Sequence, residues 1–362
     1  MAAASGAPSW ALRRLGVLMR PDPSDPREAW GVLNPACARG RDGQLYLFPR
    51  LVAEGNFSRV GRARVLFDGD ETPAAVERLG VALEPDEAWE INNTTTAGVE
   101  DPRITFIPSL DLYVMTYAAY GPLYARIGLA VSRDLERWER LGPAWFAYEP
   151  ALRTDLNLYS NKDAVLFPEP VAAPDGRPAY ALLHRPTWDL SWISPGAGAP
   201  LPAGVRDPRP GIWVSFAPVN EVTREPRTLA RFTQHRPVAL PEQPWEHLKI
   251  GAGTPPIRTP EGWLVLHHGV SGKLEPGVWH QQHVRYAAGA MLLDAEDVTK
   301  VLWRTPNPLL DPQTPQERNG IVPNVVFPTG IDPRGDGDAD VFYGMADSRI
   351  GVARLHRTGA AQ

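Results

Sequence analysis

The chain is poor in the features that mark several common classes of protein. Its 362 residues include a single cysteine, Cys37, which excludes an internal disulfide and fits a reducing compartment. The net charge is -5, and no basic stripe suggests a nucleic-acid partner. No apolar run is long enough to span a bilayer, and the run after Arg13 and Arg14 is too short for a signal peptide. We therefore expect a cytoplasmic protein without nucleic-acid or membrane partners.

Proline and glycine are plentiful instead, at 39 and 32 residues, and they favour turns over long helices. Short runs of aromatic and aliphatic residues are bounded by Gly, Asp or Pro, as β-strands are. These strand candidates are Leu45–Phe48, Tyr113–Tyr117, Tyr180–His184, Trp263–His268 and Val341–Tyr343. Each is followed by a turn and a second apolar run that contains a glycine: Gly61, Gly128, Gly211, Gly289 and Gly351.

A strand-turn-strand unit that recurs five times predicts a radial architecture. The glycines stand between 62 and 83 residues apart, so loops must be inserted between the strands. No low-complexity linker separates two halves. We therefore predict an all-β fold, a five-bladed β-propeller in one domain over residues 1–362, with an N-terminal extension over about residues 1–30. A decorated β-sandwich is the rival fold, and the fivefold recurrence makes it the weaker one.

The segment Gly98–Thr105 contains two adjacent carboxylates, Glu100 and Asp101, followed by Pro102 and Arg103. Successive residues of an extended chain point to opposite sides, so we expect only one carboxylate to face a given pocket. The other is free to pair with Arg103. The segment predicts either a structural turn with a salt bridge or a pocket with one acid, whose pKa burial or a neighbouring charge would have to raise.

A second set of candidates is cationic and lies at or near the ends of predicted strands. Arginine forks and a lysine ammonium commonly hold phosphate or carboxylate groups, although each such side chain alone is more often a solvated charge. Their shared placement favours an anion site. The set is Arg59, Arg185, Lys249 and His268.

Two other patterns give weaker signals. His280 and His283 have the spacing of a metal pair, but no third ligand stands at motif spacing, so a surface loop is the better interpretation and no metal site is predicted. Trp188, Trp192 and Trp245 are able to supply sugar-stacking platforms. Packing between blades is the more common role for any one tryptophan.

Several motifs occur in the order found in glycoside hydrolase family 130, and the chain resembles that family from about Asn34 to Leu355. The motifs are Gly98–Thr105, Asn161–Asp163, Leu166–Glu169, His184–Pro186, Lys249–Pro256, Val322–Pro328 and Phe342–Asp347. The family contains β-mannoside phosphorylases and some β-mannoside hydrolases on a five-bladed propeller. The resemblance therefore implies the same fold as the repeats do.

The resemblance also implies roles for individual residues. Asp101 looks like the general acid of the family, which is thought to reach the glycosidic oxygen through the mannose 3-hydroxyl. The cationic set Arg59, Arg185, Lys249 and His268 matches its phosphate clamp. The substrate-binding positions that it implies are Asn161, Lys162, Asp347 and Arg103.

The activity implied is inverting phosphorolysis of β-mannosides, in which inorganic phosphate attacks the anomeric carbon and α-mannose 1-phosphate is released. Phosphate is then a co-substrate, and the reaction uses no metal or other cofactor. The implied partners are a β-mannoside and phosphate. A homo-oligomer is compatible with a pocket that opens along the axis of a propeller. One alternative is a β-mannoside hydrolase whose base, Glu169 or Glu317, stands about 6.5–9.5 Å from the acid. The other is a non-catalytic sugar-binding propeller in which Asp101 is a turn residue.

Overall fold

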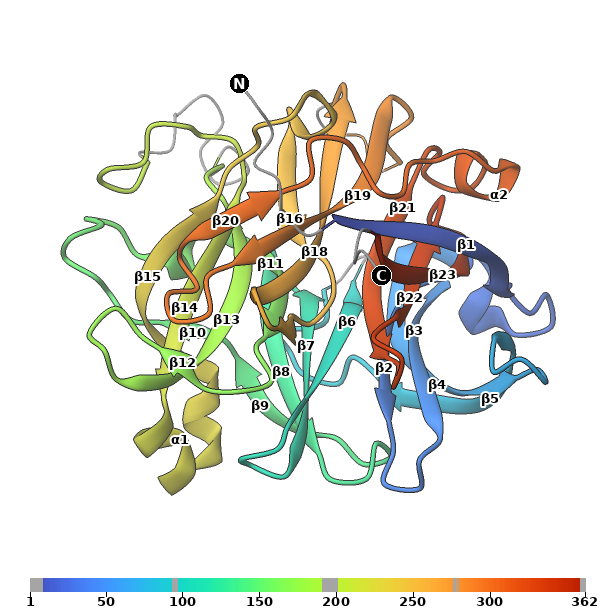
Figure 1. Cartoon of the computed structure of the whole chain (residues 1–362), viewed down its shortest axis with the longest axis horizontal. Coiled ribbons are helices and arrows are strands. Elements are labelled where there is room, and N and C mark those ends of the chain that lie inside the picture. Colours follow the sequence, from blue (N-terminus) through green and yellow to red (C-terminus); the bar gives the residue numbers. More distant parts are fainter. Residues whose placement is uncertain (1–8, 93–96, 191–200, 276–277, 279, 359–362) are drawn as a thin grey trace.

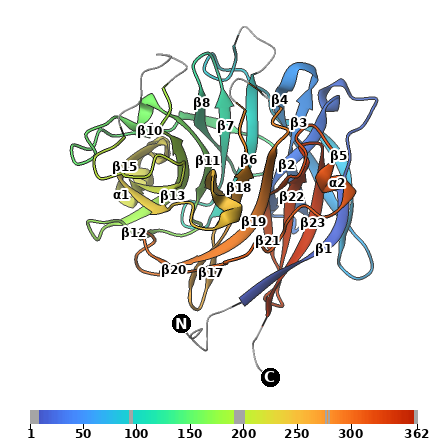
Figure 2. The same cartoon turned by 90° about the horizontal axis from the view of Figure 1, so that it is seen from above.

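The computed structural model describes residues 9–92, 97–190, 201–275, 278 and 280–358. Nearly all regular structure in that part of the chain is β-strand, in sheets that stand around a central axis (Figure 1, Figure 2). Five antiparallel blades follow one another in chain order, and the first two are joined by a single parallel bridge between Ser58 and Gly98. The predicted all-β class and five-bladed propeller are confirmed.

The first four blades begin at the axis and run outward in chain order, and the fifth does so except that its outer strand comes from the N-terminal part of the chain. The inner strands are β2 (Gly31–Arg39), β6 (Gly98–Ile107), β11 (Ser160–Leu166), β16 (Lys249–Ala252) and β21 (Val326–Pro333). The second strands are β3 (Leu45–Ala53), β7 (Leu112–Tyr120), β13 (Pro178–Thr187), β18 (Gly262–Gly272) and β22 (Ala339–Met345). The third strands are β4 (Phe57–Phe67), β8 (Ala125–Ser132), β14 (Ile212–Pro218), β19 (Val284–Leu293) and β23 (Arg349–Thr358). The outer strands are β5 (Pro73–Leu83), β9 (Glu139–Pro143), β15 (Arg231–Ala239), β20 (Val301–Arg304) and, in the fifth blade, β1 (Ser9–Met19).

Shorter elements extend this frame. The short strands are β10 (Trp145–Phe146), β12 (Val171–Ala172) and β17 (Ile257–Thr259). The α-helices are α1 (Val219–Arg224) and α2 (Pro315–Arg318), and the 3-10 helices are η1 (Pro26–Glu28), η2 (Glu54–Asn56), η3 (Leu156–Leu158), η4 (Pro226–Ala230) and η5 (Pro244–Glu246). Within the described ranges, no helix has the length and apolar character needed to cross a membrane.

The fifth blade is built from both ends of the described chain. Strand β1 pairs antiparallel with β23, from Ser9 opposite Thr358 to Met19 opposite Ile350, and the two strands lie side by side in both views (Figure 1, Figure 2). Residues 9–19, which the sequence placed in an N-terminal extension, are therefore the outer strand of a blade. This pairing closes the ring.

The recurring glycine of the sequence lies in or directly before the third strand of every blade. The register explains the residue type in two blades. Gly128 stands opposite Tyr117, and Gly351 stands opposite Tyr343. A Cβ at either glycine would overlap the tyrosine ring. The aromatic residue of the second strand thus covers the backbone of the third strand, which is why the two features recur together.

A second repeat, which the sequence analysis missed, ties each blade together. Before every inner strand stands a glutamate whose carboxylate pairs with an arginine on the outer strand of the same blade. We call these pairs the blade anchors: Glu28–Arg78, Glu90–Arg140, Glu149–Arg236, Glu246–Arg304 and Glu317–Arg14, with closest N···O distances of 2.9, 3.0, 2.6, 2.7 and 2.8 Å. Four of the five glutamate side chains are at most 2% exposed.

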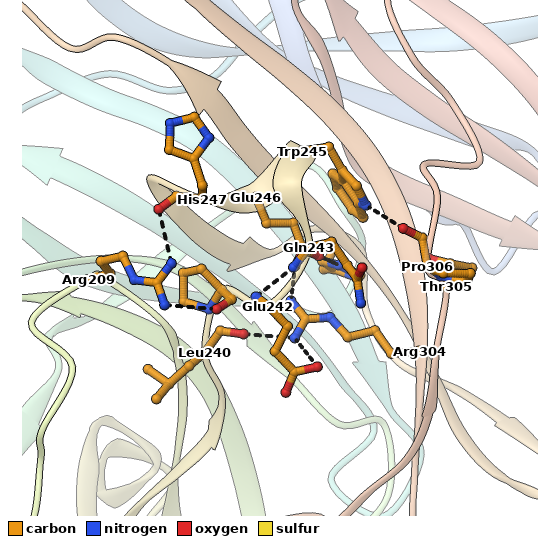
Figure 3. Close-up of polar contacts among 12 residues, drawn as sticks. Arg209, Leu240, Glu242, Gln243, Trp245, Glu246, His247, Arg304, Thr305 and Pro306 are labelled. Carbon is orange, nitrogen blue, oxygen red and sulfur yellow. Dashed lines mark hydrogen bonds and ion pairs between the residues drawn. The ribbon is translucent and has the colours of Figure 1, made fainter. Parts of the chain in front are cut away.

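Figure 3 shows the anchor of the fourth blade. Glu246 Oε2 accepts the backbone N–H groups of Glu242 and Gln243 at 3.2 and 3.1 Å, and Arg304 Nη2 lies 2.7 Å from it. The second carboxylate oxygen, Oε1, lies 2.8 Å from Nε2 of His267 on the second strand. One buried carboxylate therefore joins the loop that enters the blade, its second strand and its outer strand.

The tryptophans considered as sugar platforms pack within the fold where the structure describes them. Trp245 donates from Nε1 to the carbonyl of Pro306 at 3.2 Å, beside the fourth anchor (Figure 3). Trp188 is buried and lies edge-on against Trp213, with ring centroids 5.4 Å apart. Trp192 lies outside the described residues.

Candidate functional site

Three inner strands carry the same local distortion near their beginnings. Asn34 in β2, Asp101 in β6 and Asp163 in β11 have left-handed φ angles of 42°, 49° and 55°. Each lies where the pairing of its strand with the second strand shifts register. Such a bulge takes a side chain out of the regular alternation, and Asn and Asp tolerate the left-handed conformation better than most residues. The bulges bring one amide and two carboxylates from consecutive blades to one cavity on the axis.

This axial cavity has a volume of about 140 Å³ and is lined by residues of all five blades. An adjacent cavity, also of about 140 Å³, shares Arg50, Val322 and Asp347 with it. A larger cavity of about 650 Å³ is lined by residues near the opposite ends of the inner strands, among them Thr105 and Asp332. The polar bulges therefore mark one end of the propeller axis as the candidate site.

The guanidinium of Arg50 in β3 joins the two carboxylates of β6. Its Nη2 lies 2.6 Å from Glu100 Oε1, and its Nη1 lies 3.2 Å from Asp101 Oδ1. Asp101 Oδ1 also accepts a hydrogen bond from Asn34 Nδ2 at 2.8 Å. Asp101 lines the axial cavity and Glu100 the adjacent one, so each cavity receives one of the pair. The suggested pairing with Arg103 is wrong for Glu100, because Arg103 Nη1 donates to the backbone carbonyl of Asp101 at 2.9 Å.

These two carboxyl groups share neighbours, but their pKa values are shifted in opposite directions. Burial raises the pKa of Glu100 to about 7, since Arg50 offsets only part of the cost and the charge of Asp101 adds to it. Burial also opposes ionisation of Asp101, but Arg50, Arg103 and Lys162 outweigh it and hold its pKa below the ordinary value. Asp101 is therefore ionised in the free protein at neutral pH and must take up a proton before it acts as an acid.

Two of the expected substrate-binding residues also line the axial cavity. Asp347 follows β22 with a left-handed φ of 49°, and burial raises its pKa to about 6 against the charge of Arg50. Lys162 stands directly before the bulge at Asp163, and its Nζ donates to Tyr120 Oη at 3.1 Å. Interaction with Tyr120 outweighs burial and raises the pKa of Lys162. Both residues keep their expected place in the pocket.

A cationic cluster forms another part of the same cavity. Arg185 in β13 donates from Nη1 to His268 Nε2 in β18 at 3.2 Å. A guanidinium can only donate, so Nε2 accepts and the ring carries its hydrogen on Nδ1. Burial lowers the pKa of His268 to about 4, so the ring is neutral. Among the described residues, neither Arg185 Nε nor His268 Nδ1 has a hydrogen-bond partner, although both atoms are buried.

Lys249 lies beside this cluster. Its Nζ is 5.6 Å from the ring centroid of Tyr286, which lines the axial cavity. Burial, together with the charges of Arg185 and Lys162, lowers the pKa of Lys249 to about 7. Its ammonium form is therefore lost above neutral pH unless an anion nearby favours it.

Three expected site residues lie elsewhere. Arg59 is on the third strand of its blade, where Nε donates to Glu84 Oε2 at 2.9 Å, and it does not line the axial cavity. Asn161 precedes Lys162 by one position and so faces the other side of β11, where its amide lies 3.0 Å from His184 Nδ1. Arg103 is 1% exposed and donates to the carbonyls of residues 252 and 253, which makes it a link between inner strands.

The two bases considered for a hydrolase are both remote from the axial cavity. Glu169 is exposed and lines the large cavity at the other end of the axis. Glu317 is the anchor of the fifth blade, with Oε1 2.8 Å from Arg14 Nε and 3.0 Å from Tyr343 Oη. Neither carboxylate lines the cavity that contains Asp101.

Several residues of the cavity were not predicted from the sequence: Asn34, Arg50, Asp163 and Tyr286. A signal existed for Asn34, because Asn34-Pro35 repeats the Asp101-Pro102 pair of the next inner strand. Arg50 and Tyr286 stand in strands of ordinary composition, and only the assembled ring brings them to the axis.

Comparison with known proteins gives a consistent result. Residues 13–358 match the family model Glyco_hydro_130, described as beta-1,4-mannooligosaccharide phosphorylase. A 1,2-beta-oligomannan phosphorylase of Thermoanaerobacter sp. (strain X514) is 34% identical over 294 residues, which cover 77% of this chain and 79% of that protein. A beta-1,2-mannobiose phosphorylase of the same organism is 32% identical over 276 residues, covering 75% and 69%.

A solved structure matches the fold over almost its full length. It is the beta-1,2-mannobiose phosphorylase of Listeria innocua in complex with beta-1,2-mannobiose. The TM-score is 0.69 at 23% identity, and the match covers 95% of this chain and 96% of that one. At this identity the likeness concerns the fold.

Proposed function

Because the chain belongs to glycoside hydrolase family 130, we propose that it is a β-mannoside phosphorylase that cleaves its substrate with inversion and releases α-mannose 1-phosphate. We extend this to a β-1,2 linkage, since both curated relatives described above are named for β-1,2-mannosides. The axial cavity is the proposed site, and Arg185, His268 and Lys249 form what we call the anion clamp.

The observation that carries this proposal is the pair of unused polar atoms in the clamp. Buried polar groups are nearly always hydrogen-bonded, so a buried atom without a protein partner points to a ligand or water. Arg185 Nε and His268 Nδ1 are two such atoms in the described part of the chain, and both side chains line the axial cavity. Both are donors, and a phosphate ion offers them its unprotonated oxygens as acceptors.

In the proposed reaction a phosphate oxygen attacks the anomeric carbon while the bond from that carbon to the leaving oxygen breaks. Asp101 gives a proton to the leaving oxygen by way of the mannose 3-hydroxyl. The hydrogen of monohydrogen phosphate replaces it on Asp101, so atoms and charge balance. A phosphate dianion in the clamp offsets the cations that keep Asp101 ionised, which raises the pKa of Asp101 when the substrates are bound.

The surroundings of the clamp support phosphorolysis over hydrolysis. An inverting hydrolase needs a second free carboxylate about 6.5–9.5 Å from the acid to activate water. Glu100 forms an ion pair with Arg50, and Asp347 interacts with the same guanidinium, which also pairs with Asp101. Both carboxyl groups therefore lie on the side of the pocket that holds the proposed acid. The carboxylate within the clamp, Asp163, is occupied by an ion pair with Arg185.

The test is to incubate the purified protein with β-1,2- or β-1,4-mannobiose, each with and without inorganic phosphate. We expect α-mannose 1-phosphate, identified by phosphorus NMR, only when phosphate is present and faster from the β-1,2 substrate. Free mannose formed without phosphate would support the hydrolase, and sugar binding without turnover would support the non-catalytic alternative. Equal or faster cleavage of the β-1,4 substrate would refute the linkage alone.

A further inference from the structure

Asp163 stands in the middle of the anion clamp but takes no part in the reaction proposed above. Its side chain is 1% exposed and lies at the bulge of β11. Its carboxylate packs against Gly251 of β16, where a Cβ would overlap both Asp163 Oδ2 and His268 Cε1. Glycine at this position therefore leaves the carboxylate room beside the histidine ring.

Three basic side chains from three strands meet at this carboxylate. Asp163 Oδ2 lies 2.9 Å from Arg185 Nη1 and 3.3 Å from His268 Nε2, and Oδ1 lies 3.7 Å from Arg103 Nη2. All four side chains are at most 4% exposed. Burial opposes ionisation of Asp163, but the positive charge of Arg185, with that of Arg103 beyond it, favours the carboxylate and holds its pKa well below the ordinary value. The carboxylate is therefore charged.

We propose that Asp163 is the positioning residue of the anion clamp: it holds Arg185 by an ion pair and, through Arg185, fixes the ring of His268, so that Arg185 Nε and His268 Nδ1 face the phosphate. This inference rests on the proposed function. The carboxylate also lies between the guanidinium groups of Arg103 and Arg185. Its negative charge offsets the repulsion that these two positive charges would otherwise have in a site without water. Arg185, fixed in this way, donates from Nη1 to His268 Nε2 and so selects the tautomer whose hydrogen is on Nδ1.

Two effects of Asp163 on phosphate binding have opposite signs, which makes the inference testable. As a charge, Asp163 repels the anion, so its removal would strengthen phosphate binding. As a positioning group it aligns the donors beforehand, so its removal would weaken binding. The geometry favours the second effect, because Arg185 and His268 both contact this one carboxylate.

The main variant is Asp163→Asn, which keeps the shape and removes the charge. We measure inorganic phosphate binding by calorimetry without sugar, and the KM values for phosphate and mannoside in turnover. The expected result is a rise of about tenfold or more in the phosphate Kd and KM, since a charge-assisted contact is lost. The mannoside KM should stay within about twofold, because Asp101 and its neighbours are unchanged.

Asp340→Asn is the matched control. Asp340 is also 0% exposed and pairs with two arginines, Arg354 at 2.6 Å and Arg334 at 3.4 Å, but it lies in the fifth blade away from the axial cavity. It should lose stability like any broken buried pair and leave phosphate binding unchanged.

Gly251→Ala is the second variant, and it keeps every charge while its methyl group displaces the carboxylate of Asp163 and the ring of His268 from each other's side. It should raise the phosphate Kd in the same direction, and it decides the question if Asp163→Asn does not fold. Phosphate binding as tight as that of the wild type, or tighter, in a folded Asp163→Asn or Gly251→Ala protein overturns the inference. A wild-type protein that binds no phosphate overturns the proposed function instead, so the two failures are distinct.

Discussion

Replacing Glu317 by glutamine should separate a structural carboxylate from a catalytic one. Glu317 Oε2 accepts the backbone N–H groups of Gln313 and Thr314 at 2.8 and 2.9 Å and lies 3.1 Å from Arg14 Nη2. In the Glu317→Gln variant Arg14 loses its counter-charge. The new amide must also turn donors towards groups that themselves donate, whichever way it faces.

Removing one partner of a buried ion pair costs about 3–5 kcal/mol. The Arg14 side chain is 24% exposed, so water takes up part of its charge, and we expect the lower end, ~3 kcal/mol. With about 2.1 cal/mol/K of unfolding entropy per residue over 362 residues, this corresponds to a Tm lower by roughly 4 °C. Turnover at 25 °C should stay close to that of the wild type, because the anchor lies outside the axial cavity.

The measurements are thermal unfolding and initial rates with and without phosphate. Glu169→Gln serves as the control, because this exposed carboxylate is the other candidate base and has no anchor role; its Tm and turnover should not change. A Glu317→Gln protein with an unchanged Tm but lost turnover would refute the structural role of Glu317 and make it a candidate catalytic base again.

Three further predictions concern the acid, the clamp and the response to pH. Asp101→Asn should abolish turnover while phosphate binding persists, measured by initial rates and calorimetry; near-normal activity would remove the assignment of the acid. The phosphate KM should rise as pH increases above about 7, because Lys249 loses its charge there; Lys249→Met should flatten this rise, whereas Arg59→Ala should leave the phosphate KM and its pH profile unchanged. Burial lowers the pKa of His184 and His235 below 6.5, so the unfolded chain binds protons below that pH that the folded chain does not. When the two rings are followed by NMR, both should therefore titrate below pH 6.5 in the folded protein; a ring that titrates at or above that pH would contradict the effect of its burial.

The sequence was sufficient for the architecture because the repeat is local. A tyrosine on the second strand and a glycine on the third meet within one hairpin, as Tyr117 and Gly128 do, so both occur close together in the chain. The blade anchors escaped notice because their partners are distant: Glu317 and Arg14 stand 303 positions apart. No periodicity links such positions until the ring has formed.

The site was predicted in part for the same reason. Asp101, Lys162 and Asp347 lie in short motifs, and the structure brings them to one cavity. Strand alternation and the partner that each side chain finds decide the rest, and a motif does not reveal either. Asn161 is adjacent to Lys162 yet faces His184, and Arg59 pairs with Glu84 instead of lining the cavity.

The pairing of β1 with β23 determines when, during synthesis, the enzyme is able to complete its fold. Residues 9–19 are synthesised before the other strands of the propeller but find their partner only when residues 349–358 have been made. Until then the fifth blade lacks its outer strand. Arg14 in that strand likewise has no partner until Glu317 has been made. The axial cavity needs side chains from all five blades, so a nascent chain is inactive until its last blade closes. Removal of β1 or of β23 would open the same blade, so activity requires both of these strands.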